Sequence, residues 1–237
     1  MTFRVSGRVV YVHGFLGADA MWQHVMRDGA VAVGLPGHET GQDHRRYLDA
    51  GATFFDAAIQ FLSRLPEEQC TLVGYSMGAR LALCAALVAP EQVTALVLIG
   101  ANPGLPEGPV REERRAFEES LCTRIEEKGL ASFVDWWQTR PLFDSQQSLS
   151  KEVLAAQRAM RLCHDPVQVV RAVRAMGLAA MPDLGKHLQE LRMPVTWVAG
   201  ENDVKFADIA RRSAALTPLG RVQIISGCGH NPVLETR

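Results

Sequence analysis

Short runs of consecutive apolar residues recur along the chain, and segments with helical spacing separate them. Uninterrupted runs rich in Val, Ile and Leu are typical of parallel strands that are covered on both faces. We predict strands at 9–12, 31–33, 70–73, 95–99, 194–200 and 222–225. Helical spacing of the apolar residues predicts helices at 20–27, 53–65, 77–88 and 207–216. This alternation predicts an α/β fold with a mostly parallel sheet that is flanked by helices.

One long interval breaks the alternation. Between residues 103 and 186, charged and apolar residues follow helical spacing, and no convincing strand pattern occurs. We expect helices there at 111–128, 130–138, 151–162 and 166–176. The chain would then consist of a core in two parts, 1–102 and 187–237, and an all-helical insertion at 103–186.

Composition narrows the function classes. The 237 residues are 47% hydrophobic with a net charge of −1, and no long basic block occurs, which argues against nucleic acid as a partner. There is no 18-residue apolar run and no signal-peptide pattern at the N-terminus, so we expect a cytoplasmic protein without membrane insertion. The five cysteines have neither metal-ligand nor disulfide spacing, and we expect reduced, mostly buried thiols.

The clearest motif lies between a predicted strand and a predicted helix. Residues 74–78 read Gly-Tyr-Ser-Met-Gly, and in this context the motif forms a nucleophile elbow. The tight turn exposes the hydroxyl of Ser76 above the sheet edge, and Gly74 and Gly78 let strand and helix approach closely. The backbone N–H of Met77, at the start of the helix, would then bind a developing oxyanion.

A glycine-containing loop after the first strand supplies the second expected oxyanion donor. Residues 13–17 read His-Gly-Phe-Leu-Gly, and the backbone N–H of Phe15 would point to the same place as that of Met77. His13 itself is either part of the site or a loop histidine bonded to backbone, and we favour the second interpretation.

Ser76 needs a base, and the base needs an acid to orient it. His230 lies in a glycine-flanked loop after the last predicted strand, and Asp203 lies in the loop after the strand before it. Alone, Asp203 could be a helix N-cap and His230 a surface loop residue. Together with Ser76 they stand at the carboxyl ends of strands, where parallel sheets place their sites. They also follow the chain order Ser, Asp, His of a known triad arrangement.

With these motifs the chain resembles the α/β-hydrolase superfamily along essentially its whole length. The matching segments are 13–15 (HGF), 35–38 (LPGH), 74–78 (GYSMG), 200–203 (GEND) and 227–230 (GCGH). The resemblance implies an α/β-hydrolase fold whose helical insertion is the cap. It also implies, by default, hydrolysis of an ester, thioester or C–C bond.

Several cations lie near the motifs. Arg80 stands four residues after Ser76 on an otherwise apolar helix, so its side chain should lean back toward the serine. A buried Arg needs an anion, which is either an internal acid or, as we favour, a substrate carboxylate. Lys205 follows Asp203 by two residues, and by itself it would be a solvated loop lysine.

The insertion offers further candidates that the pattern alone does not settle. Trp136 falls off the apolar stripe of its predicted helix, so it either faces the cleft or packs against the neighbouring Trp137. Arg114 and Arg158, taken by themselves, would be solvated arginines of the insertion.

Longer stretches resemble one family within the superfamily, the SHCHC synthases (MenH type) of menaquinone biosynthesis. The most specific are VGYSMGAR at 73–80 and GENDVKF at 200–206. The others are NPGL at 102–105, FVDWWQTRPLF at 133–143, AAQR at 155–158, MGLAAMPDL at 176–184 and GHN at 229–231. The resemblance implies Ser76, Asp203 and His230 as the triad. It implies a substrate pocket lined by Tyr75, Arg80, Arg114, Trp136, Arg158 and Lys205.

The chain departs from this family at two places. Asn102 stands where relatives have a histidine before Pro-Gly-Leu, and the chain ends seven residues after His230, where the fold normally continues into a helix. We therefore expect altered packing at Asn102 and a less firmly held His230 loop.

The resemblance implies a lyase that eliminates pyruvate from a cyclohexene tricarboxylate, with the serine as base and without cofactor or metal. The expected partner is a small polycarboxylate, and the protein would be a monomer or a homodimer. Two alternatives stay open. One is a carboxylesterase or C–C hydrolase of the same fold, and the other is a non-catalytic binding protein, against which the intact triad argues.

Overall fold

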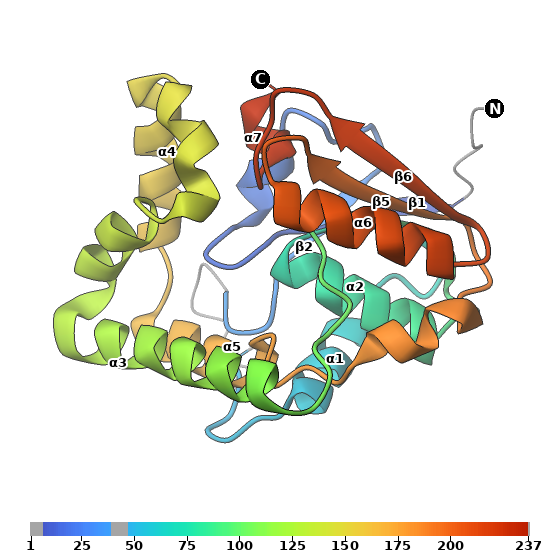
Figure 1. The fold of residues 1–237 in the computed structure, drawn as a ribbon, viewed down its shortest axis with the longest axis horizontal. Coiled ribbons are helices and arrows are strands. Elements are labelled where there is room, and N and C mark those ends of the chain that lie inside the picture. Colours follow the sequence, from blue (N-terminus) through green and yellow to red (C-terminus); the bar gives the residue numbers. More distant parts are fainter. Residues whose placement is uncertain (1–6, 39–46, 237) are drawn as a thin grey trace.

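The computed structural model describes residues 7–38 and 47–236 of the chain. Its centre is a six-stranded sheet in the order β2-β1-β3-β4-β5-β6, and every neighbouring pair is parallel (Figure 1). The strands are β1 (Arg8–Val12), β2 (Val31–Val33), β3 (Cys70–Tyr75), β4 (Val93–Ile99), β5 (Val195–Gly200) and β6 (Gly220–Ile225). The predicted parallel sheet is confirmed, and it is parallel throughout these strands.

Helices cover the two faces of the sheet unequally. One face packs against α1 (Phe54–Leu62), α2 (Met77–Val88) and α6 (Val204–Leu216), and this packing forms the largest apolar core. The other face is covered by shorter elements, the 3-10 helix η1 (Asp19–Trp22) and the C-terminal α7 (Pro232–Glu235). Burial of the apolar strand faces on both sides supplies the main stabilising term of the fold.

The helical insertion lies between β4 and β5. It consists of α3 (Pro109–Trp137), η3 (Pro141–Ser148), α4 (Lys151–Leu162) and α5 (Pro166–Met176), followed by η4 (Leu184–Glu190) (Figure 1). All residues from 103 to 186 are described, and none of them forms a strand. Apolar side chains of α3 and α5 form a separate cluster that includes Leu16 of the core, so the insertion packs both on itself and on the sheet domain.

Local sequence explains the boundaries of several helices. Thr53 and Asp56 form a capping box that starts α1, with the Thr53 N–H donating to the Asp56 carboxylate at 2.8 Å. The two helices predicted at 111–128 and 130–138 form the single element α3, which kinks at Gly129 with φ 76° and ψ 160°. Glycine tolerates this positive φ, and α3 changes direction at this residue.

One predicted helix is wrong. Residues 20–27 form a single 3-10 turn, η1, and then irregular turns. No side chain caps the N-terminus of η1. The Tyr11 hydroxyl donates to the carbonyl of Val25 at 3.2 Å, an acceptor that a continuing helix would use. Gly29 then turns the chain at φ 78°. Tertiary contacts therefore override the helical spacing.

The cysteines are free, and four of the five are buried, with Cys163 exposed. No helix among the described residues has the length and apolar character needed to cross a membrane.

Candidate active site

Ser76 occupies the turn between β3 and α2. Its φ of 51° and ψ of −110° lie outside the ordinary regions for an L-residue, and its N–H donates to the carbonyl of Ile99 at 2.8 Å. A Cβ on Gly74 would lie 2.5 Å from the Cα of Ala79, and one on Gly78 would collide with the backbone carbonyls of Val12 and His13. The Gly-x-Ser-x-Gly spacing is therefore what allows strand, turn and helix to pack here.

Gly78→Ala should lower the free energy of unfolding by about 1–3 kcal/mol, because the methyl group overpacks against backbone that has no room to move. Urea unfolding followed by circular dichroism measures this loss. Gly34→Ala is the matched control, since the nearest atom to its added Cβ is 3.9 Å away. Equal effects of the two changes would contradict this account of the elbow.

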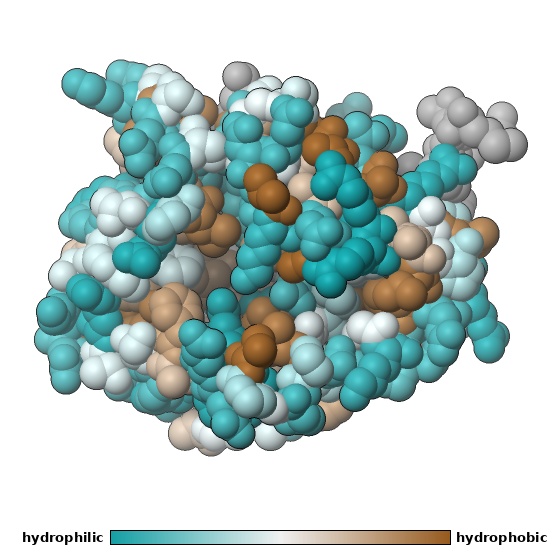
Figure 2. Space-filling view, viewed as in Figure 1, coloured by the Kyte–Doolittle hydropathy of each residue, from teal (hydrophilic) through white to brown (hydrophobic). Residues whose placement is uncertain are grey.

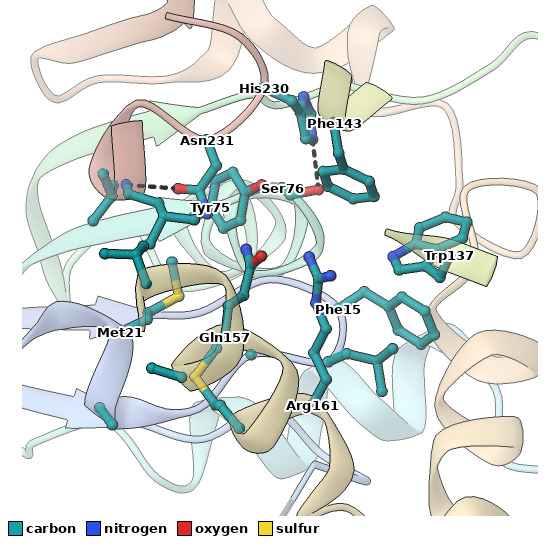
Figure 3. Close-up of a pocket in the computed structure, with 18 of the residues that line it drawn as sticks. Phe15, Met21, Tyr75, Ser76, Trp137, Phe143, Gln157, Arg161, His230 and Asn231 are labelled. Carbon is teal, nitrogen blue, oxygen red and sulfur yellow. Dashed lines mark hydrogen bonds between the residues drawn. The ribbon is translucent and has the colours of Figure 1, made fainter. Parts of the chain in front are cut away.

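His230 connects Ser76 and Asp203. Its Nδ1 lies 2.6 Å from Oδ2 of Asp203, and its Nε2 lies 3.2 Å from Oγ of Ser76 (Figure 3). The imidazole is 3% exposed and packs against the rings of Phe206 and Tyr75. A neutral His230 that donates from Nδ1 to the carboxylate presents a free lone pair on Nε2 to the serine hydroxyl. The geometry suits proton removal from Ser76.

The Asp203 carboxylate both contacts His230 and caps α6. Its Oδ2 contacts His230, while its Oδ1 accepts the N–H of Phe206 at 3.4 Å and caps α6. The two interpretations drawn from the sequence, N-cap and triad acid, are therefore compatible. The cap fixes the carboxylate in the orientation that the histidine needs.

The loop after β1 lies directly over the elbow. A Cβ on Gly14 would stand 3.2 Å from the Cβ of Ser76, which shows how closely this loop approaches the serine. His13 holds the loop through its ring: Nδ1 donates to the carbonyl of Gly14 at 2.9 Å, and Nε2 accepts the N–H of Leu35 at 3.2 Å. Burial lowers the pKa of His13 to about 4, so it stays neutral. The interpretation of His13 as a backbone-bonded loop residue is confirmed.

Two cavities flank Ser76. The first, which we call the cationic cavity, has a volume of about 450 Å³ and is lined by both expected oxyanion residues, Phe15 and Met77. Its charged lining residues are Arg80, Arg114, Arg140, Lys205, Glu118 and Asp203. Figure 2 shows the surface hollowed between the insertion and the part of the core that carries α6. Three of the predicted cations, Arg80, Arg114 and Lys205, therefore do meet around the serine.

The second cavity, which we call the α4 cavity, has a volume of about 250 Å³. It shares Phe15, Ser76, Trp137, Leu142 and His230 with the cationic cavity. Tyr75 lines it, as predicted, and burial raises the pKa of its phenol. Figure 3 shows Gln157 and Arg161 of α4 pointing toward Ser76 and Tyr75. A ligand centred on Ser76 could thus extend in two directions.

Arg80 is buried and unsatisfied. The residue is 8% exposed, and within the described part of the chain its Nη1 has no hydrogen-bond partner. Burial lowers its pKa to about 10, partly opposed by the Glu118 carboxylate, so it remains a cation at neutral pH. The Glu118 oxygens already accept from Arg114 at 2.8 Å and from the N–H groups of Leu178 and Ala179 at 2.6 and 3.1 Å. Arg80 is therefore available to an anion in the cavity.

Two of the predicted pocket residues lie elsewhere. Arg158 forms a bidentate pair with Asp135 at 2.6 and 3.0 Å on the surface, its side chain 40% exposed. Trp136 is covered by the guanidinium groups of Arg124 and Arg140 at 4.2 and 4.9 Å from its ring. Neither lines the two cavities. The family resemblance placed them in the pocket, but the inward-facing residues are their sequence neighbours, Trp137 beside Trp136 and Gln157 beside Arg158, each about 100° away around the helix.

Two residues that line the cavities were not among the candidates from the sequence. Trp137 lines both cavities, and Arg161 lines the α4 cavity, 5% exposed and with its Nη1 unpartnered. Burial lowers the pKa of Arg161 to about 10, and its guanidinium stands over the ring of Phe143 at 5.1 Å. The sequence could have indicated Arg161, because Gln157 and Arg161 are four residues apart and share one face of α4. Arg140 was also missed, and nothing in its local pattern marks it.

The first departure from the family pattern is accommodated locally. Asn102 is buried, lines the cationic cavity and accepts the N–H of Gly104 at 3.0 Å, so it holds the turn after β4. Within residues 7–38 and 47–236 there is no group of three or more His, Cys, Asp or Glu side chains arranged to hold a metal ion.

Comparison with known proteins agrees with this architecture. Residues 9–237 match the Alpha/beta hydrolase family. A putative 2-succinyl-6-hydroxy-2,4-cyclohexadiene-1-carboxylate synthase of Bacillus subtilis is 32% identical, over 97% of this chain and 86% of its own length. The synthase of Salmonella arizonae is 30% identical over 94% of this chain and 86% of its own length.

A solved structure shows the same relation. The structure of MenH from S. aureus superposes with a TM-score of 0.89 at 31% identity, over 98% of this chain and 90% of its own. The chain therefore belongs to the alpha/beta hydrolase family and is related, along nearly its whole length, to the 2-succinyl-6-hydroxy-2,4-cyclohexadiene-1-carboxylate synthases within it.

Proposed function

We propose that this protein is a lyase that eliminates pyruvate from 2-succinyl-5-enolpyruvyl-6-hydroxy-3-cyclohexene-1-carboxylate and forms the cyclohexadiene product, SHCHC. The observation that carries the proposal is Arg80, which lines the cavity that also holds Ser76 and His230 and whose buried Nη1 has no hydrogen-bond partner among the described residues. Its relatives in Bacillus and Salmonella bear the name of this activity. In this proposal the insertion at 103–186 acts as the cap over the site.

The charges of the two cavities suit a substrate with three carboxylates. Arg80, Arg114, Arg140 and Lys205 line the cationic cavity, and Arg161 lines the α4 cavity on the other side of the serine. A cyclohexene ring at Ser76 would direct its carboxylates to both sides. Guanidinium groups bind carboxylates with paired, charge-assisted hydrogen bonds, so they would orient the ring as well as bind it.

The triad would act as a relay that makes the serine a base. Asp203 orients His230, and Nε2 of His230 takes the hydroxyl proton of Ser76. The Ser76 oxygen then removes a ring proton that is acidic through conjugation with the succinyl ketone. The ketone oxygen gains negative charge, which the N–H groups of Phe15 and Met77 stabilise. The electron pair then forms a new ring double bond between C2 and C3, the existing double bond shifts to C4 and C5, and the C–O bond to the enolpyruvyl group breaks. Protonation of the released enolate gives pyruvate.

Pyruvate release tests this proposal directly. The wild-type protein is incubated with the enolpyruvyl substrate, and pyruvate is measured by reduction with NADH and lactate dehydrogenase. A neutral short-chain ester serves as the comparison substrate. We expect rapid pyruvate release and slow ester turnover. A folded protein that releases no pyruvate but cleaves the ester, at a rate that Arg80→Ala leaves unchanged, would overturn the proposal in favour of a hydrolase.

Arg161 and Arg158 form a matched pair on α4. Arg161→Met should lower kcat/KM for pyruvate release by about tenfold to a hundredfold, because a charge-assisted hydrogen bond to a carboxylate contributes about 1.5–3 kcal/mol. Arg158→Met should change it by less than about twofold, since an exposed ion pair contributes at most about 1 kcal/mol to stability and nothing to binding. The reverse ranking would show that α4 turns its other face to the substrate.

A further inference from the structure

The loop that carries His230 is held by one carboxylate. Glu235, in α7, accepts the N–H of Gly229 at 2.5 Å through Oε2 and the N–H of Asn231 at 3.2 Å through Oε1. These two N–H groups flank His230 on either side in the chain. The carboxylate therefore fixes the backbone from which the imidazole projects, at a site where Asn231 and His230 are 6% and 3% exposed.

Helix α7 has a side-chain cap at its N-terminus. Asn231 caps it, because its Oδ1 accepts the N–H of Leu234 at 3.2 Å (Figure 3). The contact of Glu235 to the N–H of Asn231 also closes the N-terminus of α7, whereas its contact to the N–H of Gly229 lies outside the helix and holds the loop. We expected a less firmly held His230 loop from the sequence. In the structure, Glu235 of the short α7 binds the backbone of this loop on both sides of His230.

The insertion reaches the same carboxylate. Gln146 of η3 donates to Oε1 of Glu235 at 3.5 Å, and Gln157 of α4 donates to Oε1 of Gln146 at 3.2 Å. Both glutamines are buried, 3% and 7% exposed. Ser145 packs directly on Gly229, where any Cβ would collide with its side chain. The chain of contacts runs from the α4 cavity, which Gln157 lines, to the backbone on both sides of His230.

We propose that Glu235 is a positioning residue that holds His230 in line with Ser76 and that Gln146 and Gln157 couple this placement to the seating of the insertion. The inference deepens the proposed lyase function and uses its reaction as one readout. The half-buried Glu235 carboxylate is a strong acceptor for two N–H groups, and displacement of a catalytic group by about 1 Å can lower a rate about a hundredfold. A displacement of the insertion would break the contacts between Gln146 and Glu235, and His230 would then be held less firmly.

The test compares Glu235→Gln, Glu235→Ala and Gln146→Leu with a control, Glu190→Gln. The control removes an exposed carboxylate that, among the described residues, pairs only with His187, at 2.8 Å. Two readouts are measured for each: kcat and KM for pyruvate release, and the rate at which phenylmethanesulfonyl fluoride inactivates the protein. The second readout needs an activated Ser76 but no polycarboxylate substrate.

We expect Glu235→Ala to lower kcat by about tenfold to a hundredfold with KM within about threefold, and to slow inactivation by a similar factor. Glu235→Gln should have an intermediate effect, since one acceptor oxygen remains. Gln146→Leu should lower both rates by a few fold. Its combination with Glu235→Ala should be no slower than Glu235→Ala alone, because residues that act through one contact chain are not additive.

Three results would overturn the inference: unchanged kcat and inactivation rates in Glu235→Gln, a lower melting temperature as the only effect of either Glu235 change, or fully additive losses in the double variant. If Glu235→Ala does not fold, Glu235→Gln and Gln146→Leu carry the test alone. A wild type that releases no pyruvate, while the Glu235 changes still slow inactivation, would reject the proposed lyase reaction and keep this inference.

Discussion

Replacing Ser76 with alanine should reduce kcat for pyruvate release by about 10³–10⁴-fold while KM stays within about threefold. The side chain that removes the ring proton is lost, and positioned general bases contribute about 10²–10⁴-fold to enzyme rates. The substrate carboxylates would still be bound, because Arg80, Arg114 and Lys205 line the cavity independently of the serine hydroxyl. Steady-state kinetics at saturating and limiting substrate separate the two parameters.

Detection of a covalent adduct on Ser76 distinguishes a serine that acts as a base from one that acts as a nucleophile. In the proposed elimination Ser76 exchanges only protons, so intact-protein mass spectrometry during turnover should show no covalent adduct. A hydrolase would accumulate an acyl-enzyme on Ser76 with a slow ester. Asp203→Asn is a useful companion variant, since it keeps the N-cap acceptor of α6 while it weakens the orientation of His230. Adduct formation with the enolpyruvyl substrate would contradict the role of the serine as base.

The second large effect concerns Arg80. Arg80→Met should lower kcat/KM for pyruvate release by about a hundredfold or more, because loss of a buried partner to a substrate carboxylate costs about 2–5 kcal/mol. The same change should leave the free energy of unfolding unaltered or raise it. Burial of the unpartnered Nη1 destabilises the free protein, and Glu118 keeps its bonds to Arg114 and to two backbone N–H groups.

Arg111→Met is the matched control for Arg80→Met. Arg111 is equally buried, but its guanidinium is satisfied by the carbonyl of Leu105 and by Glu107 at 3.1 Å. We expect this change to lower stability and to leave kcat/KM within about threefold. Urea unfolding and pyruvate release, measured on both variants, test the contrast. Loss of stability in Arg80→Met would identify Arg80 as part of a structural ion pair, the alternative drawn from the sequence.

Much of the site was predictable from the chain because its residues follow strands. Ser76, Asp203 and His230 stand in the loops after β3, β5 and β6, and a parallel sheet gathers such loops at one edge whatever their separation in sequence. The structure brings these three side chains within hydrogen-bonding distance, while their catalytic roles remain proposals. Lys205, which the family resemblance implied, reaches the cavity because it stands two residues after Asp203 in the first turn of α6.

The sequence by itself thus determined the parallel sheet, the helical insertion and the loops that meet at the serine, because apolar periodicity and strand-end motifs are local properties. Only the tertiary structure decided which face of each insertion helix looks inward. Trp137 and Arg161 line the cavities, whereas Trp136 and Arg158 lie outside, at helix rotations about 100° and about 60° away, and packing against the core sets these rotations. It likewise decided that residues 20–27 do not form a helix, since the 3-10 turn η1 ends at Trp22 and irregular turns follow. The contacts of Glu235 to backbone N–H groups of the His230 loop were also visible only in the structure, because no local sequence pattern indicates them.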